Sequence, residues 1–318
     1  MEIYRTERKG NLIVDWQNKA SDHDYCAECW ADLRIGQGPC GYRCAECFLI
    51  LTHRVKADPS RHILYSNASD FVGAAKKWLL SATPKTSLGV GIDCSDSLLY
   101  EGVTGYARRL IPWFADARTN PDGRKLVLLT KSANVRYLEG LPTRNVVMSF
   151  SLNPQAVADV FEGKYPDGLR VTPAIQERLD ASRRAAEFGF ETRWRIDPIV
   201  PIEGWDDCYR EFFIQAAHLQ PFRITLGIYR RMGSSLAQFA RSWGLTAMDW
   251  QPDSPMVRDE GSHFQLPTRE RIALYRNISE YIKEAWPDQA RRPVVSLCKE
   301  KRTVREESGV ISRDCNCS

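Results

Sequence analysis

Residues 39–48 of the chain read Pro39-Cys40-Gly41-Tyr42-Arg43-Cys44-Ala45-Glu46-Cys47-Phe48. The three cysteines follow one another at C-x3-C-x2-C spacing. Soft thiolates suit iron–sulfur clusters, and three of them can hold three corners of a cubane [4Fe–4S] cluster, which leaves the fourth iron open to the amine and carboxylate of a cofactor. A zinc ion completed by another cysteine or by His53 is the alternative, but zinc loops usually pair their cysteines as C-x2-C. The loop therefore predicts a cluster held by Cys40, Cys44 and Cys47.

The rest of the composition is that of a globular protein. The 318 residues are 43% hydrophobic and 26% charged, which argues against disorder and fibres. The net charge of +4 neither requires nor opposes a nucleic-acid partner. No apolar run reaches the roughly 18 residues of a membrane helix, and residues 1–7 lack the apolar core of a secretion signal. We expect a cytoplasmic protein without a membrane partner.

The chain contains ten cysteines, many for a protein in a reducing compartment. Metal binding or catalysis explains them better than disulfides do. Cys26 and Cys29 form a C-x2-C pair, and Cys315 and Cys317 a C-x-C pair near the other end. Together they could supply four thiolates to a zinc ion or a second [4Fe–4S] cluster, with Cys298 as a spare ligand. Free thiols on a frayed tail are the alternative.

Short apolar runs alternate with helical patterns beyond the loop. The expected strands are 33–36, 88–93, 125–131, 146–153, 193–200 and 223–229. The expected helices are 68–80, 97–114, 154–161, 173–188, 205–217, 234–243 and 268–286. Thr268 is the expected N-cap of the last helix, and Pro287 ends it. Six strand–helix units favour parallel strands with right-handed crossovers, and thus an α/β barrel whose site lies at the strand C-termini.

The pattern divides the chain into three parts. Residues 1–32 form an N-terminal segment with the first cysteine pair, residues 33–287 form the barrel, and residues 288–318 form a basic tail that carries the last cysteines. Such a basic run is usually a solvated surface.

Polar groups follow several of the expected strands, as a cofactor pocket requires. They are Cys94 and Asp96 after the second strand, Lys131 after the third, and Ser151 and Asn153 at the end of the fourth. Other interpretations remain open. Cys94 could be a small buried apolar residue, and Asp96 and Asn153 could cap the helices that follow them.

The cysteine spacing, followed by an aromatic residue, resembles the signature of the radical S-adenosylmethionine enzymes. The resemblance implies a partial (β/α)6 barrel of the TIM type and a [4Fe–4S] cluster whose open iron binds S-adenosylmethionine. It also implies that one electron, from a donor such as flavodoxin or ferredoxin, cleaves the cofactor to methionine and a 5′-deoxyadenosyl radical. The protein then positions the radical and excludes water.

The order of the later segments resembles the spore photoproduct lyase family, which reverses a thymine dimer in DNA. The segments are 62–67, Cys94-Ser95-Asp96, Leu129-Thr130-Lys131, Phe150-Ser151-Leu152-Asn153, Arg178, and Asp197-Pro198-Ile199 with Glu203-Gly204-Trp205. The resemblance runs from about residue 33 to residue 285, which is most of the chain.

The family resemblance also implies roles for individual residues. Cys94 falls at the position of a cysteine that donates a hydrogen atom to the product radical. Lys131 would neutralise the carboxylate of the cofactor, and Ser151 would donate a hydrogen bond to it. Asp96, Asn153 and Arg178 would contact its adenosine or methionine portions.

The sequence also departs from the family pattern. Glu46 and Phe48 stand where the lyase has tyrosines, so a phenol relay through those two positions is excluded. In the stretch 249–260, which corresponds to a basic DNA-binding hairpin, there are four acidic residues and one basic residue. Acidic side chains repel the phosphate backbone and oppose duplex DNA as the substrate.

Three functions follow from these observations. The first is a radical enzyme of the lyase type, with Cys94 as hydrogen donor and thymine-lesion repair as the nearest reaction. The second is a related radical enzyme that modifies RNA, a nucleoside or a peptide with the help of a second metal centre. The third is a zinc-stabilised binding protein without catalytic activity.

Overall fold

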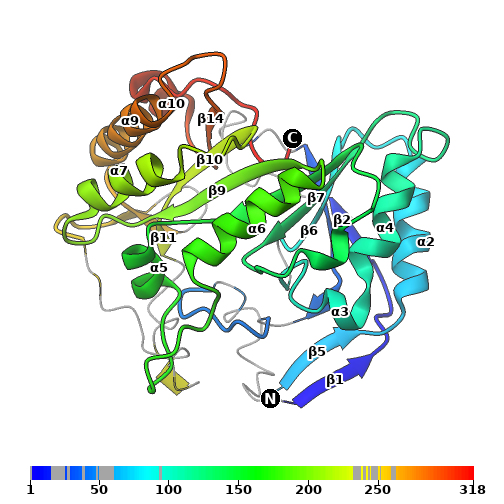
Figure 1. Ribbon diagram of the computed structural model, residues 1–318. Coiled ribbons are helices and arrows are strands. Elements are labelled where there is room, and N and C mark those ends of the chain that lie inside the picture. The colour runs from blue at the N-terminus through cyan, green and yellow to red at the C-terminus, as the bar shows by residue number, and fades with distance from the viewer. Residues whose placement is uncertain are drawn as a thin grey trace.

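The central feature of the molecule, seen in a computed structural model, is an eight-stranded sheet (Figure 1). The structure describes residues 2–15, 26, 29–37, 40–47, 49, 61–92, 95–231, 238, 241–242, 244, 250, 252–258 and 263–318. The strands in sheet order are β14 (Val294–Leu297), β10 (Arg223–Ile228), β9 (Glu191–Ile199), β8 (Val146–Ser151), β7 (Lys125–Thr130), β6 (Ser87–Val90), β3 (Trp30–Leu33) and β2 (Ile13–Asp15).

Seven of these strands are parallel, and only β2 pairs antiparallel, with β3. From β3 to β10 they follow one another in chain order, as repeated right-handed strand–helix units require. The predicted α/β class and six-unit parallel barrel are therefore confirmed.

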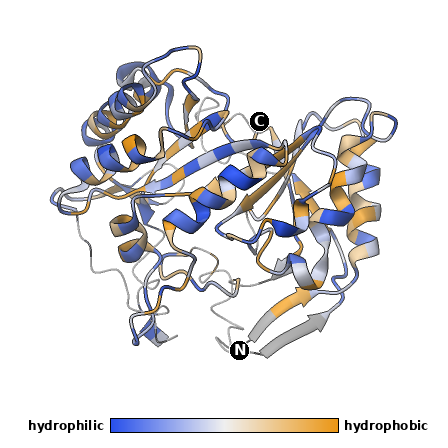
Figure 2. Cartoon of the chain, viewed as in Figure 1, coloured by the Kyte–Doolittle hydropathy of each residue, from blue (hydrophilic) through white to orange (hydrophobic). Residues whose placement is uncertain are grey.

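Helices cover the outer face of this sheet. They are α2 (Ala68–Leu79), α3 (Glu101–Thr104), α4 (Tyr106–Ala115), α5 (Gln155–Phe161), α6 (Ile175–Glu187), α7 (Trp205–Ala216), α9 (Thr268–Ala285) and α10 (Arg302–Ser308), with a 3-10 turn η1 at Arg136–Leu138. α2 packs against α4, and α9 packs against both α7 and α10. Figure 2 shows mainly hydrophilic colour on α6 and hydrophobic colour on β6 and β7. The core therefore lies between the helices and the strands.

Two small sheets flank the central one. β5 (Arg61–Tyr65) lies between β1 (Glu2–Thr6) and β4 (Gly36–Gln37), and β13 (Phe264–Gln265) lies between β11 (Arg230–Arg231) and β12 (Val257–Arg258). In the described residues, no helix is long and apolar enough to span a lipid bilayer.

Side chains alternate along the inner strands, as the pleat of a sheet requires. On β8, Met148 and Phe150 join the hydrophobic core under the helices. The residues between and after them, Ser149 and Ser151, have the opposite orientation and face the interior of the barrel. β9 and β10 repeat this pattern. These strands thus turn polar side chains towards the interior of the barrel, where Ser151, Arg195 and Asp197 line a cavity.

Several predicted boundaries differ from the structure. The first barrel strand is Trp30–Leu33 rather than 33–36, because Asp32, which is 2% exposed, interrupts the apolar run that the sequence pattern relied on. The predicted helix 97–114 is divided into α3 and α4 at Gly105, whose φ of 63° ends the first helix. The N-cap of α9 is Pro267, and Thr268 is its first helical residue. The predicted helix 234–243 lies mostly outside the described residues.

The segment 288–318 is not a solvated tail. It contains β14, which pairs in parallel with β10, and α10, which packs on α9. Its last residues enter the barrel interior, where Asn316 is 1% exposed. The Asn316 amide nitrogen donates to Ser149 Oγ over 2.9 Å, and its Oδ1 accepts from Thr225 Oγ1 over 2.9 Å. A polar barrel interior thus provides the partners that bury this segment.

Candidate active site

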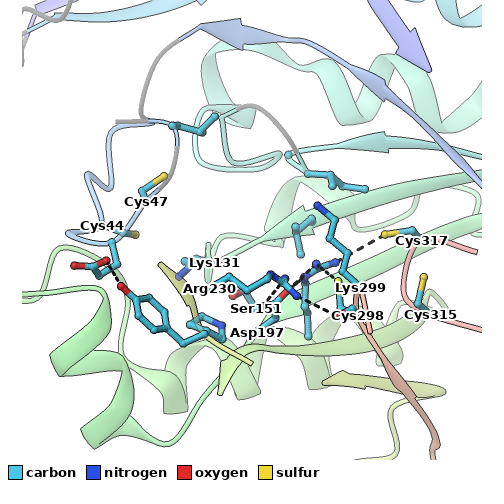
Figure 3. Close-up of a pocket in the computed structure, with 18 of the residues that line it drawn as sticks. Cys44, Cys47, Lys131, Ser151, Asp197, Arg230, Cys298, Lys299, Cys315 and Cys317 are labelled. Atoms are coloured by element: carbon cyan, nitrogen blue, oxygen red, sulfur yellow. Dashed lines mark hydrogen bonds and ion pairs between the residues drawn. The ribbon is translucent and has the colours of Figure 1, made fainter. Parts of the chain in front are cut away.

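A cavity of about 400 Å³ runs through the barrel. At one end lie the cysteine loop and the C-terminal ends of the strands. At the other end lie Cys315 and Cys317. Figure 3 shows the two groups of thiols on opposite sides, with Lys131, Ser151 and Asp197 between them. The sequence prediction that polar groups collect at the strand ends is met by this arrangement.

The cysteine loop is held by two tight turns. The Arg43 amide donates to the Cys40 carbonyl over 3.1 Å, and the Cys47 amide donates to the Cys44 carbonyl over 3.1 Å. Arg43 has a φ of 53°, a left-handed conformation that closes the first turn. The Ala45 amide donates to the Glu162 carbonyl and ties the loop to the end of α5. All three thiols line the cavity.

The environment of these thiols suits a cluster. Burial raises the pKa of Cys40 and Cys44 to about 12, so both are protonated at neutral pH unless a cation binds them. In the described residues, no three His, Cys, Asp or Glu side chains are arranged to hold a single metal ion. A [4Fe–4S] cluster is larger than one ion and would take one thiol at each of three irons, and all three thiols line the cavity.

Lys131 follows β7 and forms an ion pair with Glu162 at the cavity wall. Arg178 on α6 pairs with the same carboxylate and donates to the Ser151 carbonyl over 3.1 Å. Burial alone would raise the pKa of Glu162, but the two cations lower it to about 2. Arg178 therefore holds the Ser151 backbone directly and Lys131 through Glu162, and does not itself line the cavity. Sequence reasoning missed Glu162 because it is the C-cap residue of α5 and belongs to none of the motifs.

Asp96 lines the cavity and organises the turn after β6. Its carboxylate accepts from the Leu98 and Leu99 amides, from Thr130 Oγ1 over 2.8 Å, and from the Lys131 amide over 2.6 Å. Burial raises its pKa, and these hydrogen bonds oppose the shift. Asp96 does not cap the helix that follows, since the N-cap of α3 is Tyr100. It holds the turn at Leu98 and Leu99 and fixes the position of Lys131.

Asn153 connects β8, β9 and α7. Its amide nitrogen donates to the Pro198 carbonyl over 3.0 Å, and its Oδ1 accepts from the Tyr209 hydroxyl over 3.0 Å. Asn153 does not line the cavity, whereas Ser151, two residues earlier, does. Both the nitrogen and the oxygen of the Asn153 side-chain amide therefore bind other parts of the scaffold.

Cys94 lies outside the described residues, as do His53 and Phe48. Of the described residues nearest to it in sequence, Ile92 and Asp96 line the cavity and Ser95 does not. The hydrogen-donor role of Cys94 stays a prediction.

Sequence reasoning missed the polar group in the middle of the cavity. Arg195 Nη2 donates to Asp197 Oδ2 over 2.7 Å and to Cys298 Sγ over 3.0 Å. Arg230 lies 3.5 Å from the other oxygen of Asp197, and Lys299 lines the same wall. The signal was present in β9, where Arg193, Arg195 and Asp197 alternate along one face of the strand.

Glu46 has a partner across the cavity. The Tyr229 hydroxyl donates to Glu46 Oε2 over 2.9 Å, and Tyr229 packs edge-on against Phe161 and Trp250. Burial raises the pKa of Glu46 and the hydrogen bond from Tyr229 partly opposes the shift. A phenol from the residue after β10 thus reaches the cysteine loop, in addition to Tyr42 within the loop, which also lines the cavity.

Comparisons with known proteins agree with this architecture. A family model described as spore photoproduct lyase matches residues 16–228, more than half of the chain. The spore photoproduct lyase of Clostridium acetobutylicum is 21% identical over 212 residues, and the match covers 66% of this chain and 59% of the relative. The chain therefore matches about three fifths of the length of this relative.

Solved structures extend the agreement in fold. A spore photoproduct lyase complexed with dinucleoside spore photoproduct superposes with a TM-score of 0.71 at 18% identity, over 93% of this chain and 81% of that one. A mutant with bound AdoMet and dinucleoside spore photoproduct gives a TM-score of 0.72 at 18% identity, over 94% and 82%. Since the family model covers most of the barrel and the fold agrees over nearly the whole chain, the protein belongs to the spore photoproduct lyase family.

Proposed function

We propose that the protein is a radical S-adenosylmethionine lyase that repairs a thymine photolesion. The observation that carries this proposal is the placement of the C-x3-C-x2-C thiols, Lys131 and Ser151 on the wall of one cavity. Family membership supports the same reaction class.

Cys40, Cys44 and Cys47 would hold the [4Fe–4S] cluster. When bound, the cluster and S-adenosylmethionine supply a 5′-deoxyadenosyl radical that abstracts a hydrogen atom from the substrate. Metal binding to buried thiols of raised pKa releases their protons, so the loaded site forms more readily as the pH rises.

Lys131 and Ser151 would receive the methionine end of the cofactor. The Lys131 ammonium uses one donor on Glu162 and has two further donors for a carboxylate. Because Arg178 also neutralises Glu162, the local charge still favours an anion. Ser151 is 8% exposed and lines the cavity, so its hydroxyl can donate to the same group.

The substrate portion of the cavity carries excess positive charge. Arg195 and Arg230 share the single carboxylate of Asp197, and Lys299 lies beside them. Related enzymes are known in complex with dinucleoside spore photoproduct, a small nucleotide-like substrate. A cavity of about 400 Å³ is too small for a duplex, so a lesion in DNA would enter only when flipped out of the stack.

Cys94 would complete the reaction as hydrogen donor. A thiol S–H bond is weak enough to quench a carbon radical. Support for this role comes from the family resemblance at Cys94-Ser95-Asp96 and from Asp96, which lines the cavity.

The test uses anaerobically reconstituted protein, with dithionite or a flavodoxin as the electron source. Incubation with dinucleoside spore photoproduct and S-adenosylmethionine is expected to give 5′-deoxyadenosine and repaired thymines. Substrate deuterium is expected to appear in the 5′-deoxyadenosine. Cys94→Ala is expected to keep cofactor cleavage and to lose or divert the repaired product.

Cys208→Ser on α7 is the matched control, because Cys208 does not line the cavity. It should behave as the unaltered protein does. Suppose that the enzyme cleaves the cofactor without label transfer from this lesion, yet transfers label from an RNA, nucleoside or peptide substrate. That result would show that the proposed substrate is wrong and the enzyme class is right. Protein without iron or cofactor cleavage would refute the proposal.

A further inference from the structure

The second group of cysteines gathers at the end of the cavity opposite the loop. The Cys29 thiol donates to the Cys317 carbonyl over 3.2 Å and is hydrogen-bonded to the Cys315 thiol, which in turn contacts the Cys317 thiol. Cys26 interacts with Cys29 and lines the same cavity. Residues separated by almost the whole chain therefore bring four thiols together.

The backbone that carries Cys315 and Cys317 is fixed in several ways. The Cys317 carbonyl accepts from Ser87 Oγ as well as from Cys29. The Cys315 carbonyl accepts from Arg223 Nη1 over 2.6 Å. Between these cysteines, the buried Asn316 binds Ser149 and Thr225. A loose end would not be held by so many buried polar contacts.

The charge around the thiols suits an anionic centre. Arg193 and Arg195 on β9 and Arg223 on β10 point at residues 315–318. Arg195 Nη1 lies 3.8 Å from Cys317 Sγ. Arg223 approaches a carboxylate only at 4.0 Å, that of Asp314, which is largely exposed. Four thiolates around a divalent metal carry two negative charges, and buried guanidinium groups stabilise such a charge.

We infer that Cys26, Cys29, Cys315 and Cys317 form a second metal centre, a tetrathiolate site that closes the far end of the barrel. None of the nine described cysteines forms a disulfide. As they stand, no three described side chains of the ligating types are arranged around one metal ion. Rotation of the thiols and loss of their protons would replace the S–H contacts with metal–sulfur bonds.

Cys298 is the nearest competitor for a place in this centre. Its buried thiol accepts from Arg195 Nη2 over 3.0 Å, and its amide is held by the Leu226 carbonyl over 2.7 Å at the end of β14. The inferred centre takes Cys26 in its place, because Cys26 lies close enough to Cys29 for the two groups to interact electrostatically. Cys298 therefore provides a matched control from the same cavity.

The centre is tested in a variant that lacks the first cluster, Cys40→Ala with Cys44→Ala and Cys47→Ala. This design separates the inference from the proposed reaction, since the variant cannot carry out that reaction. Elemental analysis of the anaerobic protein is expected to find about one zinc per chain, or several irons with matching acid-labile sulfide, as the two tetrathiolate centres differ in metal content. Cys315→Ser with Cys317→Ser in this background should remove the metal, and Cys298→Ser should keep it.

A second measurement uses the unaltered protein and does not depend on variants that fold. Mass spectrometry after alkylation should find Cys26, Cys29, Cys315 and Cys317 protected in the metal-loaded protein and labelled after a chelator is added. Cys208 should be labelled equally in both states. Metal-free protein from the triple variant, together with equal labelling of Cys29 with and without chelator, would overturn the inference. If Cys298→Ser lost the metal and Cys26→Ser retained it, the inferred ligand set would be wrong, with Cys298 as a ligand in place of Cys26.

Discussion

The two ends of the cavity place their thiols by different means. At the strand C-termini, three cysteines lie within eight residues, and two local turns fix them. At the opposite end, the thiols come from residues almost 300 positions apart, and buried polar contacts to β6, β8, β9 and β10 hold them. A local loop needs only its own backbone, whereas the distant pairs need a finished barrel.

The largest effect is expected from Cys44→Ser in the loop. Loss of one of three cluster ligands should reduce the formation of 5′-deoxyadenosine below detection, because a hydroxyl is a poor ligand for iron. Liquid chromatography of the products and iron analysis measure this. The opposite end should be unaffected, so unchanged protection of Cys315 from alkylation is the control. Full cofactor cleavage by this variant would show that the loop does not hold the cluster.

Glu162→Gln tests whether the Glu162 carboxylate stabilises the end of the cavity that carries the cysteine loop. Removal of one partner from a buried ion pair costs about 3–5 kcal/mol, because Lys131 and Arg178 lose their common carboxylate. Urea denaturation of the metal-free protein measures the free energy of unfolding. Glu187→Gln, which removes an exposed pair with Arg183, should change it by less than about 1 kcal/mol. Equal effects of the two variants would contradict this stabilising role.

The same carboxylate predicts a pH dependence of stability. The folded-state pKa of Glu162 is about 2, below its ordinary value of 4.5, so the unfolded chain binds its proton first as the pH falls. This contribution is complete above pH 4.5 and is lost as the pH falls towards 2; at about 1.4 kcal/mol per unit it amounts to about 3 kcal/mol. Unfolding curves at several pH values measure it. Glu162→Gln should show a flatter profile in this window, and an unchanged slope would refute the assignment.

A smaller effect is expected from Asn316→Ala at the other end. The substitution leaves Ser149 without its partner and Thr225 without one acceptor in a buried site, at a cost of about 1–3 kcal/mol. Limited proteolysis should release the segment after α10 sooner than in the unaltered protein. Ile311→Ala, at a residue that is 73% exposed, is the control and should leave the cleavage rate unchanged. Equal rates for both variants would show that Asn316 does not anchor the segment.

The same contrast explains what the sequence could predict. The cysteine spacing and the strand–helix alternation are local signals, and they predicted the barrel and the loop. The first barrel strand, β3, was predicted three residues too late, because the buried Asp32 interrupts its apolar run. The hydrophobic periodicity predicted one helix where Gly105 separates two. Glu162 and Asn316 could not be found in this way, and for Arg195 the alternation along β9 indicated only its face of the strand. Their roles depend on partners from other strands, and no spacing in the sequence indicates those partners.

The entry of residues 315–318 into the barrel has a consequence for biosynthesis. On the ribosome, every strand of the sheet is made before these residues appear. Until then, Ser149, Arg193 and Thr225 lack the contacts that Asn316 supplies, and this part of the interior remains open to water. Consolidation of the nascent barrel therefore waits for residues 315–318, and a chain stalled before them would expose a hydrated, incompletely packed interior to the quality-control machinery of the cell.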